Sequence, residues 1–219
     1  MKLSARLKAA VFAALWVAFG LAIGALSRAQ TPASAAKPDL LPRDSEMAVA
    51  LSAGPAHFAE QAGVYVLEQG GYVKVRESKN GFTCIVDRDS PQSFEPQCFD
   101  AEGTATSLPV VLYKAEMRAQ GKSEEEANRL VAEGYGTGRF RAPRRPGIVY
   151  MLSRENRVVA DPATGKVISY PPHVMFYAPY LTNADVGAGP GAPVFVINEG
   201  TPGALVIVNV PVPKGEAKI

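Results

Sequence analysis

The sequence predicts an α+β domain in which an antiparallel sheet receives one helical insert. Alternating apolar segments cluster at 64–88 and again at 148–211. A stretch with helical period, 107–134, lies between these two groups. Runs of strands separated by a single helical insert favour α+β over the strictly alternating βαβ arrangement.

The chain begins with a pattern typical of a secretory signal peptide. Lys2, Arg6 and Lys8 precede an uncharged run, Ala9–Ser27, and small residues follow up to Ala29. This layout predicts cleavage after Ala29 and export to the periplasm or the medium. The alternative is an uncleaved membrane anchor, because the run is about long enough to span a bilayer. Contact with a membrane is expected only through this segment.

The charge balance changes when residues 1–29 are set aside. They hold four of the 23 basic residues and no acid, so 19 basic and 21 acidic residues remain, a net charge of −2. A nucleic-acid partner is therefore not expected. We expect a flexible tether at 30–44, a single domain at 45–213 and a frayed tail at 214–219.

The domain is expected to open with two short helical pieces and a three-strand meander. The pieces fall within 45–62 and are separated at Gly54-Pro55. The strands 64–69, 72–78 and 82–88 are joined at Gly70-Gly71 and Asn80-Gly81, which are typical of two-residue hairpin loops. Within the third strand, period-2 alternation places Phe82, Cys84 and Val86 on the face directed toward the core.

The insert at 107–134 is expected to be a helical hairpin lying on the sheet. Leu108, Leu112 and Ala115 form an apolar stripe in its first half, and Gly121 is a typical helix end. Ser123 and Glu126 have the spacing of a capping box, which begins the second helix.

Six further strands are expected after the hairpin. The last two, 193–199 and 204–211, are nearly continuous apolar runs, so we expect them to be central and covered on both faces. The six candidate segments are 148–153, 157–160, 166–170, 173–179, 193–199 and 204–211.

The two cysteines of the chain, Cys84 and Cys98, are expected to form a disulfide. They are 14 positions apart, around a loop rich in Pro, Asp and Ser, and export would place them in an oxidising compartment. The alternative is a cysteine hydrolase acting on a peptide or amide of the cell envelope. In it Cys84 would be the nucleophile, with His173 and then Asn183 or Asp185 following in the order of papain-like enzymes. A buried mid-strand cysteine is unusual for such a nucleophile, which commonly lies at a helix N-terminus.

Two further segments suggest ligand binding. Residues 171–187 combine His173, Tyr177 and Tyr180 with a polar end, which indicates a small pocket, or else a core strand that enters a turn. Residues 138–147 offer guanidinium groups to an anionic ligand, or form a solvated connector. The arginines of this segment are Arg139, Arg141, Arg144 and Arg145.

No metal site and no cofactor is expected. The 13-residue spacing between the cysteines lacks the close pair of structural zinc sites, and 87–95 departs from a calcium loop at several positions. The segments NGFTCIVDR, CFD and PPHVMFYAP, on a chain of this size, resemble a group of exported bacterial proteins of unknown function. This resemblance implies export and a shared domain over about 46–185, and implies no activity.

We therefore expect an exported domain, stapled by a Cys84–Cys98 disulfide, that binds a small molecule or a component of the envelope and is not an enzyme. The hydrolase and the arginine-dependent anion site remain the alternatives. The identity of the ligand does not follow from the sequence.

Overall fold

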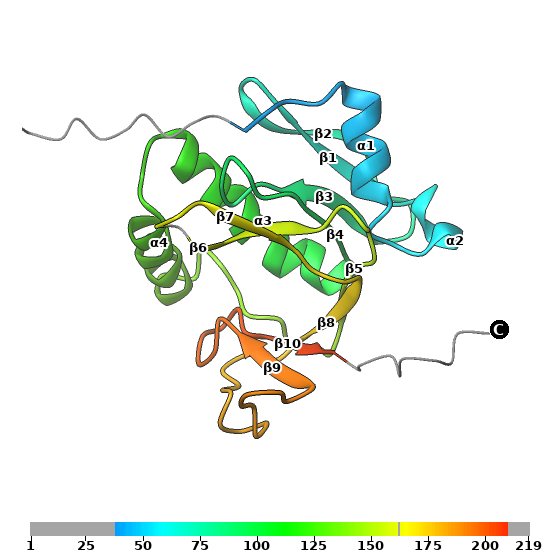
Figure 1. The fold of residues 1–219 in the computed structure, drawn as a ribbon. Helices are drawn as coiled ribbons and strands as arrows, with labels where there is room; N and C mark the ends of the chain where they lie inside the picture. The colour runs from blue at the N-terminus through cyan, green and yellow to red at the C-terminus, as the bar shows by residue number, and fades with distance from the viewer. Residues whose placement is uncertain (1–37, 162, 210–219) are drawn as a thin grey trace, which may run out of the picture. The chain divides into compact units, whose positions relative to one another are not determined.

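The computed structural model describes residues 38–161 and 163–209 (Figure 1). The predicted signal segment 1–29 and the predicted tail 214–219 lie outside these residues, as does most of the predicted tether. The helices of the described part are α1 (Arg43–Leu51), α2 (Ala56–Ala59), α3 (Ala101–Ala119) and α4 (Glu124–Gly136). Its strands are β1 (Gly63–Glu68), β2 (Gly71–Arg76), β3 (Thr83–Asp87), β4 (Glu95–Phe99), β5 (Ile148–Met151), β6 (Arg157–Asp161), β7 (Lys166–Ser169), β8 (His173–Tyr177), β9 (Val194–Ile197) and β10 (Leu205–Val208).

Eight of these strands form one sheet in the order β2-β1-β3-β4-β5-β8-β10-β9, and β6 pairs with β7 in a separate two-stranded ribbon. All neighbours in the large sheet are antiparallel except β1 and β3. The predicted α+β class, with a helical hairpin between two groups of strands, is confirmed.

The predicted three-strand meander is wrong at its second turn. Strands β1 and β2 do form a hairpin, although its two loop residues are Gln69 and Gly70 instead of Gly70-Gly71, but β3 pairs with β1 in parallel instead of returning beside β2. The Asn80 side chain explains the difference, because its Nδ2 donates to the carbonyl of Phe58 in α2 (2.9 Å) and its Oδ1 accepts from the amide of Phe82 (3.1 Å). This contact holds the turn before β3 beside α2, and β3 then runs next to the start of β1. Gly81 has a positive φ of 84° but Asn80 does not, so the two-residue hairpin loop expected at Asn80-Gly81 is not formed.

Strand β4 was not expected, since its segment contains Pro96 and reads as a loop. In the structure it lies at the centre of the sheet, with Cys98 opposite Cys84 and Pro96 opposite Val86. The Cα atoms of the cysteines are 4.0 Å apart, as in a non-hydrogen-bonded antiparallel pair. Hydrogen-bonded and non-hydrogen-bonded pairs alternate along an antiparallel ladder, so Val86 and Pro96, two residues away, are again a non-hydrogen-bonded pair. The nitrogen of Pro96 therefore faces away from β3, and no hydrogen bond between the two strands is lost.

The helices lie where the sequence predicted them, except that α3 begins earlier. Gly54 separates α1 from α2, and α4 begins after Ser123, whose Oγ accepts from the amide of Glu126 (3.1 Å). Helix α3 begins at Ala101, six residues earlier than expected. Its N-cap is Asp100, whose Oδ1 accepts from the amide of Gly103 (2.9 Å). Gly103, Thr104 and Thr106 have low helix propensity, so the sequence did not indicate this early start.

All six C-terminal strands occur, but β9 is not central. It is the edge strand of the large sheet, and β10 is its only neighbour there. A continuous apolar run normally indicates burial on both faces, but only Val196 of β9 is buried and the other three residues are half-buried. The loop residue Asn183 takes the place of a second neighbouring strand: its side chain donates to the carbonyl of Val196 (3.0 Å) and accepts from the amide of Val196 (2.8 Å).

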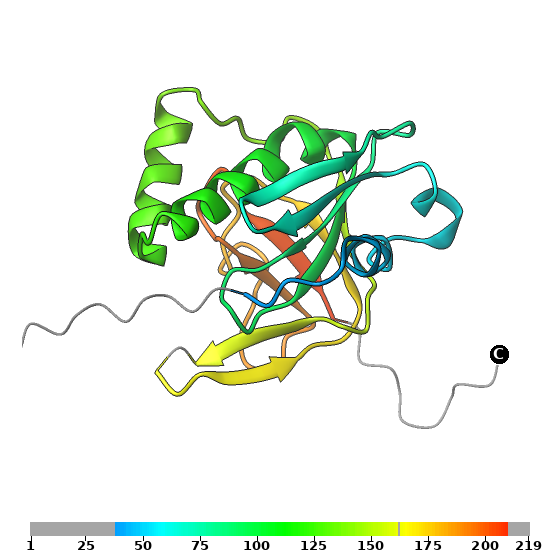
Figure 2. The same cartoon turned by 90° about the horizontal axis from the view of Figure 1, so that it is seen from above.

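Two hydrophobic cores lie on opposite faces of the sheet. The first is formed by α1 and α2 against Cys84, Val86 and Cys98. The second is formed by α3 against β5, β8 and β10. Seen from above, α1 and α3 lie on opposite sides of the central strands (Figure 2). Within the described part of the chain, no helix is long and apolar enough to cross a membrane.

Candidate functional site

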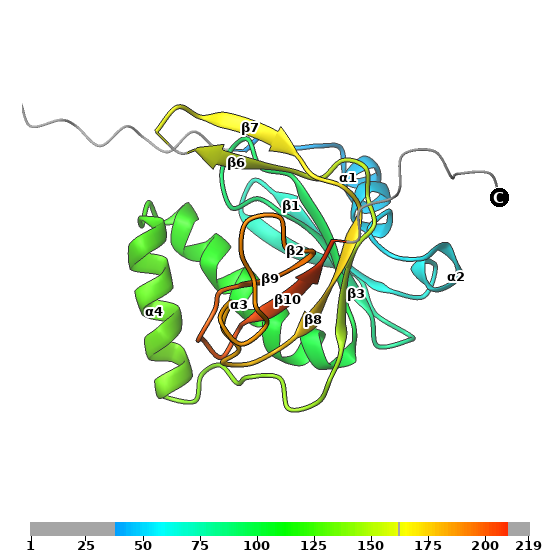
Figure 3. The same cartoon turned by 60° about the horizontal axis from the view of Figure 1, so that its bottom comes forward.

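A cavity of about 890 Å³ lies on the α3 side of the sheet. Helices α3 and α4, the β6–β7 ribbon and the β9–β10 loop contribute to its walls, and strands β4, β5, β8, β10 and β9 form its floor. Figure 3 shows α4 and the β6–β7 ribbon on two different sides of β9 and β10.

The register of the strands explains why the cavity floor is apolar. Phe99 lies opposite Val149, Val149 opposite Met175, and Met175 opposite Ile207, which in turn lies opposite Phe195. These cross-strand neighbours share one face of the sheet. They form a continuous apolar row under the cavity.

The two helices turn one stripe each toward this floor. On α3 the lining residues follow helical spacing, as they do on α4, so each stripe is a single helix face. Both stripes are apolar at their centres and polar toward their ends. The α3 residues are Ser107, Val110, Val111, Lys114 and Arg118, and the α4 residues are Asn128, Val131, Ala132 and Tyr135.

Carboxyl groups from two neighbouring strands also line the cavity. Asp87 ends β3 and Glu95 begins β4, and the two are directly opposite each other in the antiparallel register. Residues opposite each other in such a pair have neighbouring side chains on one face. Asp89 lines the same cavity just beyond β3. Like charges in this position normally destabilise a sheet, so the pair is an unusual feature.

The environment raises the pKa of both carboxyl groups. Burial raises the pKa of Glu95 to about 8, and the charges of Asp89 and Asp87 add to this effect. Burial also raises the pKa of Asp87, which the nearby Arg118 partly offsets. The Tyr170 hydroxyl donates to Glu95 Oε2 (3.1 Å), and burial together with the Glu95 charge raises the pKa of this phenol. The pair can hold a proton near neutral pH, as closely spaced carboxyl groups commonly do.

The two cationic side chains that line the cavity already have acidic partners. Arg118 lies 3.6 Å from Asp87 and 3.2 Å from Glu124, and Lys114 pairs with Glu124. Glu95 and Asp89 form no ion pair with any described residue. Among the residues described, no three His, Cys, Asp or Glu side chains gather in a metal-binding arrangement.

His173 and Gln97 add two polar groups to the lining on the strand side of the cavity. The His173 ring lies 5.4 Å from the Tyr170 ring, and its Nδ1 is 3.0 Å from the carbonyl oxygen of Pro171. Since a carbonyl only accepts, Nδ1 carries the proton and Nε2 is left as an acceptor in the neutral ring. Gln97 is only 8% exposed, and no hydrogen bond joins its amide to the rest of the described chain.

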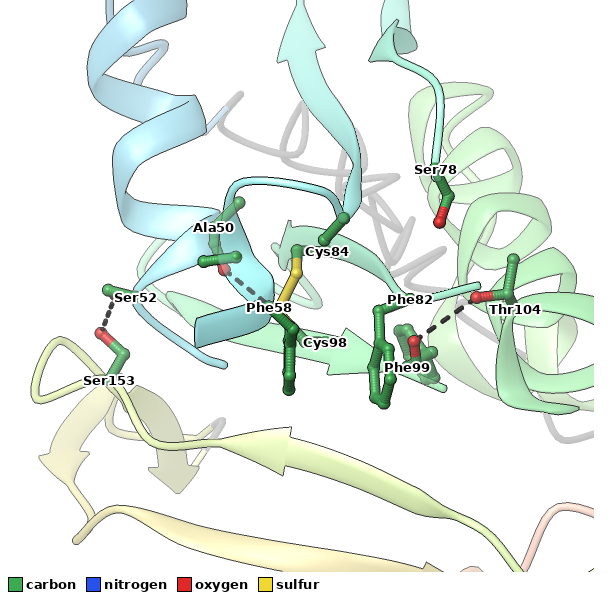
Figure 4. Close-up of a disulfide and its surroundings, with 12 residues drawn as sticks. Ala50, Ser52, Phe58, Ser78, Phe82, Cys84, Cys98, Phe99, Thr104 and Ser153 are labelled. Carbon is green, nitrogen blue, oxygen red and sulfur yellow. Dashed lines mark hydrogen bonds between the residues drawn. A yellow bond between two sulfur atoms is a disulfide. The ribbon is translucent and has the colours of Figure 1, made fainter. Parts of the chain in front are cut away.

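The predicted disulfide between Cys84 and Cys98 is present, and it lies outside this cavity. Both cysteines are fully buried in the first core, on the α1 side of the sheet. Figure 4 shows the bond between the two strands, with Phe58 and Phe82 beside it and the carbonyl of Ala50 pointing toward Cys98. The phenyl rings of Phe58 and Phe82 stack with centroids 4.2 Å apart.

The structure does not assemble the residues of the hydrolase alternative. Cys84 has no free thiol, and it faces the first core while His173 lines the cavity on the other side. Asn183 is occupied with the backbone of Val196. Asp185 binds the backbone amide and hydroxyl of Thr182, which lowers the pKa of its carboxyl. Both residues therefore shape the loop before β9.

Of the predicted pocket residues, only His173 lines the cavity. Tyr177 is buried, and its hydroxyl lies 3.2 Å from both Asp100 Oδ1 and the carbonyl oxygen of Ile148. Tyr180 is 62% exposed and has a positive φ of 67°. Tyr177 therefore links β8 to Asp100 and Ile148, and Tyr180 is a turn residue.

The arginine segment also lies away from the cavity lining. The Arg139 guanidinium stacks 4.1 Å from the ring of Tyr113. Arg144 donates its backbone amide to Glu102 Oε1 (2.8 Å), and the Arg145 side chain pairs with Glu102 Oε2 (3.3 Å). Arg141 is exposed. The segment is thus tied to the first turn of α3, and its side chains do not converge on one point.

Sequence reasoning missed the principal feature, which is the Asp87–Glu95 pair beside an apolar cavity. Asp87 was placed correctly on the face opposite Cys84, but Glu95 lay in a segment read as loop. The available signal was the symmetry about the cysteines: Asp87 lies three residues after Cys84 and Glu95 three residues before Cys98. If the cysteines are cross-strand partners, the acids must be partners too.

In comparisons with known proteins, no family model, no curated protein and no solved structure matches this chain. Fold and site therefore define its class by themselves. It is a disulfide-stapled α+β domain with one large, mostly apolar cavity that has a carboxyl-rich section.

Proposed function

We propose that this chain is an exported binding domain, not an enzyme, and that its ligand is a small molecule whose apolar body occupies the cavity. The observation that carries the proposal is the cavity itself. Its volume of about 890 Å³ lies within the range typical of small-molecule sites. Its lining is largely apolar, with a few polar groups, which is also typical of such sites.

The construction of the floor supports a preformed site. Phe99, Val149 and Met175 are almost fully buried and belong to the second core. Asp100 accepts from the amide of Gly103 in α3 (2.9 Å) and from the amide of Ile148 in β5 (2.9 Å), so the helix and the floor are joined at one residue. A cavity held in this way loses little conformational entropy when a ligand enters.

The alternatives lack this support. A cysteine hydrolase requires a thiolate within reach of a base, and Cys84 is bonded to Cys98 on the other side of the sheet. Within 139–145, the Arg139 side chain stacks on Tyr113 and the Arg145 side chain pairs with Glu102, so these two arginines are directed to different partners. The apolar cavity is therefore the better candidate for the binding function.

Export remains part of the proposal. The disulfide is typical of oxidising compartments, and the N-terminal pattern of residues 1–29 is typical of a signal peptide. The resemblance to exported bacterial proteins agrees with both. An intact mass of the protein from the envelope fraction tests this point: a chain beginning at Gln30 is expected, and a mass that includes residues 1–29 would contradict cleavage.

The binding function can be tested with Nile red, a neutral apolar dye whose fluorescence rises in apolar surroundings. We expect saturable binding by the purified protein. Ser107→Trp places a large side chain from α3 into the cavity and is expected to weaken dye binding at least tenfold. Ala105→Trp is the matched control, because Ala105 is exposed on the same helix and does not line the cavity.

Equal binding by the wild type, Ser107→Trp and Ala105→Trp would overturn the proposal, as would no binding by the wild type. Circular dichroism and thermal unfolding of the three proteins establish that each is folded. If Ser107→Trp does not fold, Val131→Trp on α4 tests the same cavity from its other wall.

A further inference from the structure

We propose that the carboxyl-rich section of the cavity is a subsite for a protonated amine, so that the ligand is an amphipathic molecule with a cationic nitrogen and an apolar body. This inference rests on the proposed binding function and specifies its ligand class. The groups that would hold the nitrogen are Asp87, Glu95, Gln97 and the ring of His173.

The charged groups around Glu95 favour a cationic ligand. The groups that face Glu95 are Asp87 and Asp89 from the β3 end, Lys114 and Arg118 from α3, and Tyr170 and His173 from the segment that enters β8. Both α3 cations are engaged with Asp87 or Glu124. Glu95 has no cationic partner among the described residues, and a cationic ligand would supply one when Glu95 gives up its proton.

Independently of these charges, the side chain of Gln97 also favours a ligand in this section of the cavity. Its side chain is more than nine-tenths buried, it lines the cavity, and its amide has no hydrogen-bonding partner among the described residues. Gln97 lies two residues after Glu95 on β4, so both side chains are on the same face. The amide of Gln97 opens onto the cavity, and a ligand that donates a hydrogen bond would satisfy its oxygen.

The acceptors at this place suit an ammonium group in number and kind. Asp87 Oδ1 is buried and accepts no hydrogen bond, although the Arg118 guanidinium lies 3.6 Å from it. His173 Nε2 and the Gln97 oxygen are further acceptors, while Glu95 already accepts one bond from Tyr170. An alkylammonium ion has three N–H donors and no acceptor, as the lysine side chain does. An anionic or purely accepting head group would leave these oxygens unsatisfied.

The neighbouring lining explains the apolar body. Met151 and Met175 line the cavity next to this polar section, since Met151 is the cross-strand partner of His173. From there the floor continues to Ile207 and Phe195. A molecule with its nitrogen at Glu95 therefore has apolar surface within reach of its first carbon atoms.

The test compares three probes that have the same chain and different heads: octylamine, octanol and octanoate. Each is titrated against Nile red bound to the wild-type protein at pH 7. We expect octylamine to compete at least tenfold better than octanol, and octanoate to be the weakest. Because a protonated Glu95 must lose its proton to pair with an ammonium ion, calorimetry in buffers of different ionisation enthalpy should record proton release when octylamine binds.

Variants assign the effect to the subsite. Glu95→Gln should weaken octylamine binding at least fivefold, abolish the proton release and leave octanol unchanged. Gln97→Leu should also weaken octylamine more than octanol. Glu60→Gln is the matched control, because it removes the same charge from an exposed position outside the cavity.

The outcomes separate this inference from the function on which it rests. If Nile red and octanol bind and octylamine binds no better, or if octanoate binds best, the amine subsite is overturned and the binding function stands. An octylamine preference that persists in Glu95→Gln also overturns the subsite. If neither dye nor octanol binds, the binding function itself fails.

Discussion

The hydroxyl of Tyr177 lies 3.2 Å from Oδ1 of Asp100, the residue that caps α3. A strand of the C-terminal group is thereby joined to the helix that covers it. The contact leaves no free space, because a Cβ on Gly103 would lie 1.8 Å from the Tyr177 hydroxyl oxygen.

This contact predicts a large effect for Gly103→Ala. The added methyl group must displace the Tyr177 ring, so we expect a loss of roughly 1–3 kcal/mol in the free energy of unfolding, as for overpacked cores. Gly136→Ala is the control, since nothing lies within 4 Å of its added Cβ at the end of α4 and alanine is the better helix former. Urea denaturation measures both, and equal stability of the two variants would contradict the steric argument.

The Glu46–Arg88 ion pair should behave differently from exposed pairs. Its atoms are 2.7 Å apart and its side chains are 1% and 5% exposed, with the Arg88 guanidinium 4.1 Å from the ring of Phe94. Arg88→Met leaves a buried carboxyl group without its partner, and we expect a loss of about 3–5 kcal/mol at pH 7. Burial already raises the pKa of Glu46, so the variant should recover stability as the pH falls and this group becomes neutral.

The control for that variant is Arg43→Met. Arg43 pairs with Glu68 on the surface, where the arginine side chain is 60% exposed. An exposed pair contributes less than about 1 kcal/mol. If the two variants lost the same free energy in chemical denaturation, burial would not be the deciding factor.

Removal of the disulfide should destabilise the domain without emptying its cavity. The bond closes a loop with a sequence separation of 14, and such a loop contributes on the order of 3 kcal/mol. We expect Cys84→Ala/Cys98→Ala to lose about this amount in urea denaturation and to retain Nile red binding at low temperature. Loss of dye binding by a folded double variant would indicate that the two faces of the sheet are coupled.

The same bond should resist reduction in the folded protein. Both cysteines are fully buried, so a reductant reaches them only when the structure opens. Alkylation followed by intact mass should therefore show no modified cysteine until reductant and denaturant are combined. Rapid alkylation of the cysteines after treatment with reductant alone, without denaturant, would contradict the burial of this bond.

Glu95 should make the domain less stable as the pH rises. Burial raises its pKa in the folded state to about 8, above the ordinary value of 4.5, so the folded protein binds more protons than the unfolded chain between these values. Stability that is present below about pH 4.5 is therefore lost as the pH rises through 8, by an amount on the order of 5 kcal/mol. Asp87 and Glu46, whose pKa values are also raised, contribute in the same direction.

The variant Glu95→Gln tests this assignment. It should match the wild type at pH 5 and be the more stable of the two at pH 9, as measured by urea denaturation at both pH values. Glu60→Gln should follow the wild-type profile. Parallel profiles for the wild type and Glu95→Gln would show that Glu95 is not the titrating group.

Local sequence patterns predicted most elements of this fold, and long-range pairing limited the rest. The helical hairpin, the first β-hairpin and the C-terminal strands were visible because periodicity and turn residues act over a few positions. The parallel pairing of β3 with β1 depends on a contact between Asn80 and the carbonyl of Phe58, 22 residues apart, which no local pattern encodes.

The candidate site was harder to predict for the same reason. His173 was identified from its own segment, but its neighbours in the cavity come from β3, β4 and α3. Pro96 concealed the strand that carries Glu95 and Gln97, and the carboxyl pair was missed with it, although its symmetry about the two cysteines was visible. Tyr177, one of the expected pocket residues, instead lies with its hydroxyl between Asp100 and the carbonyl group of Ile148.

The contact between Asn183 and Val196 has a consequence for association between molecules. Unpaired backbone groups at a sheet edge invite another chain to add a strand, which is a route to fibres and aggregates. Here a side-chain amide occupies both polar groups of the central edge residue, much as a neighbouring strand would. The domain therefore terminates its own sheet at β9, and this edge is protected from adding a strand of another molecule.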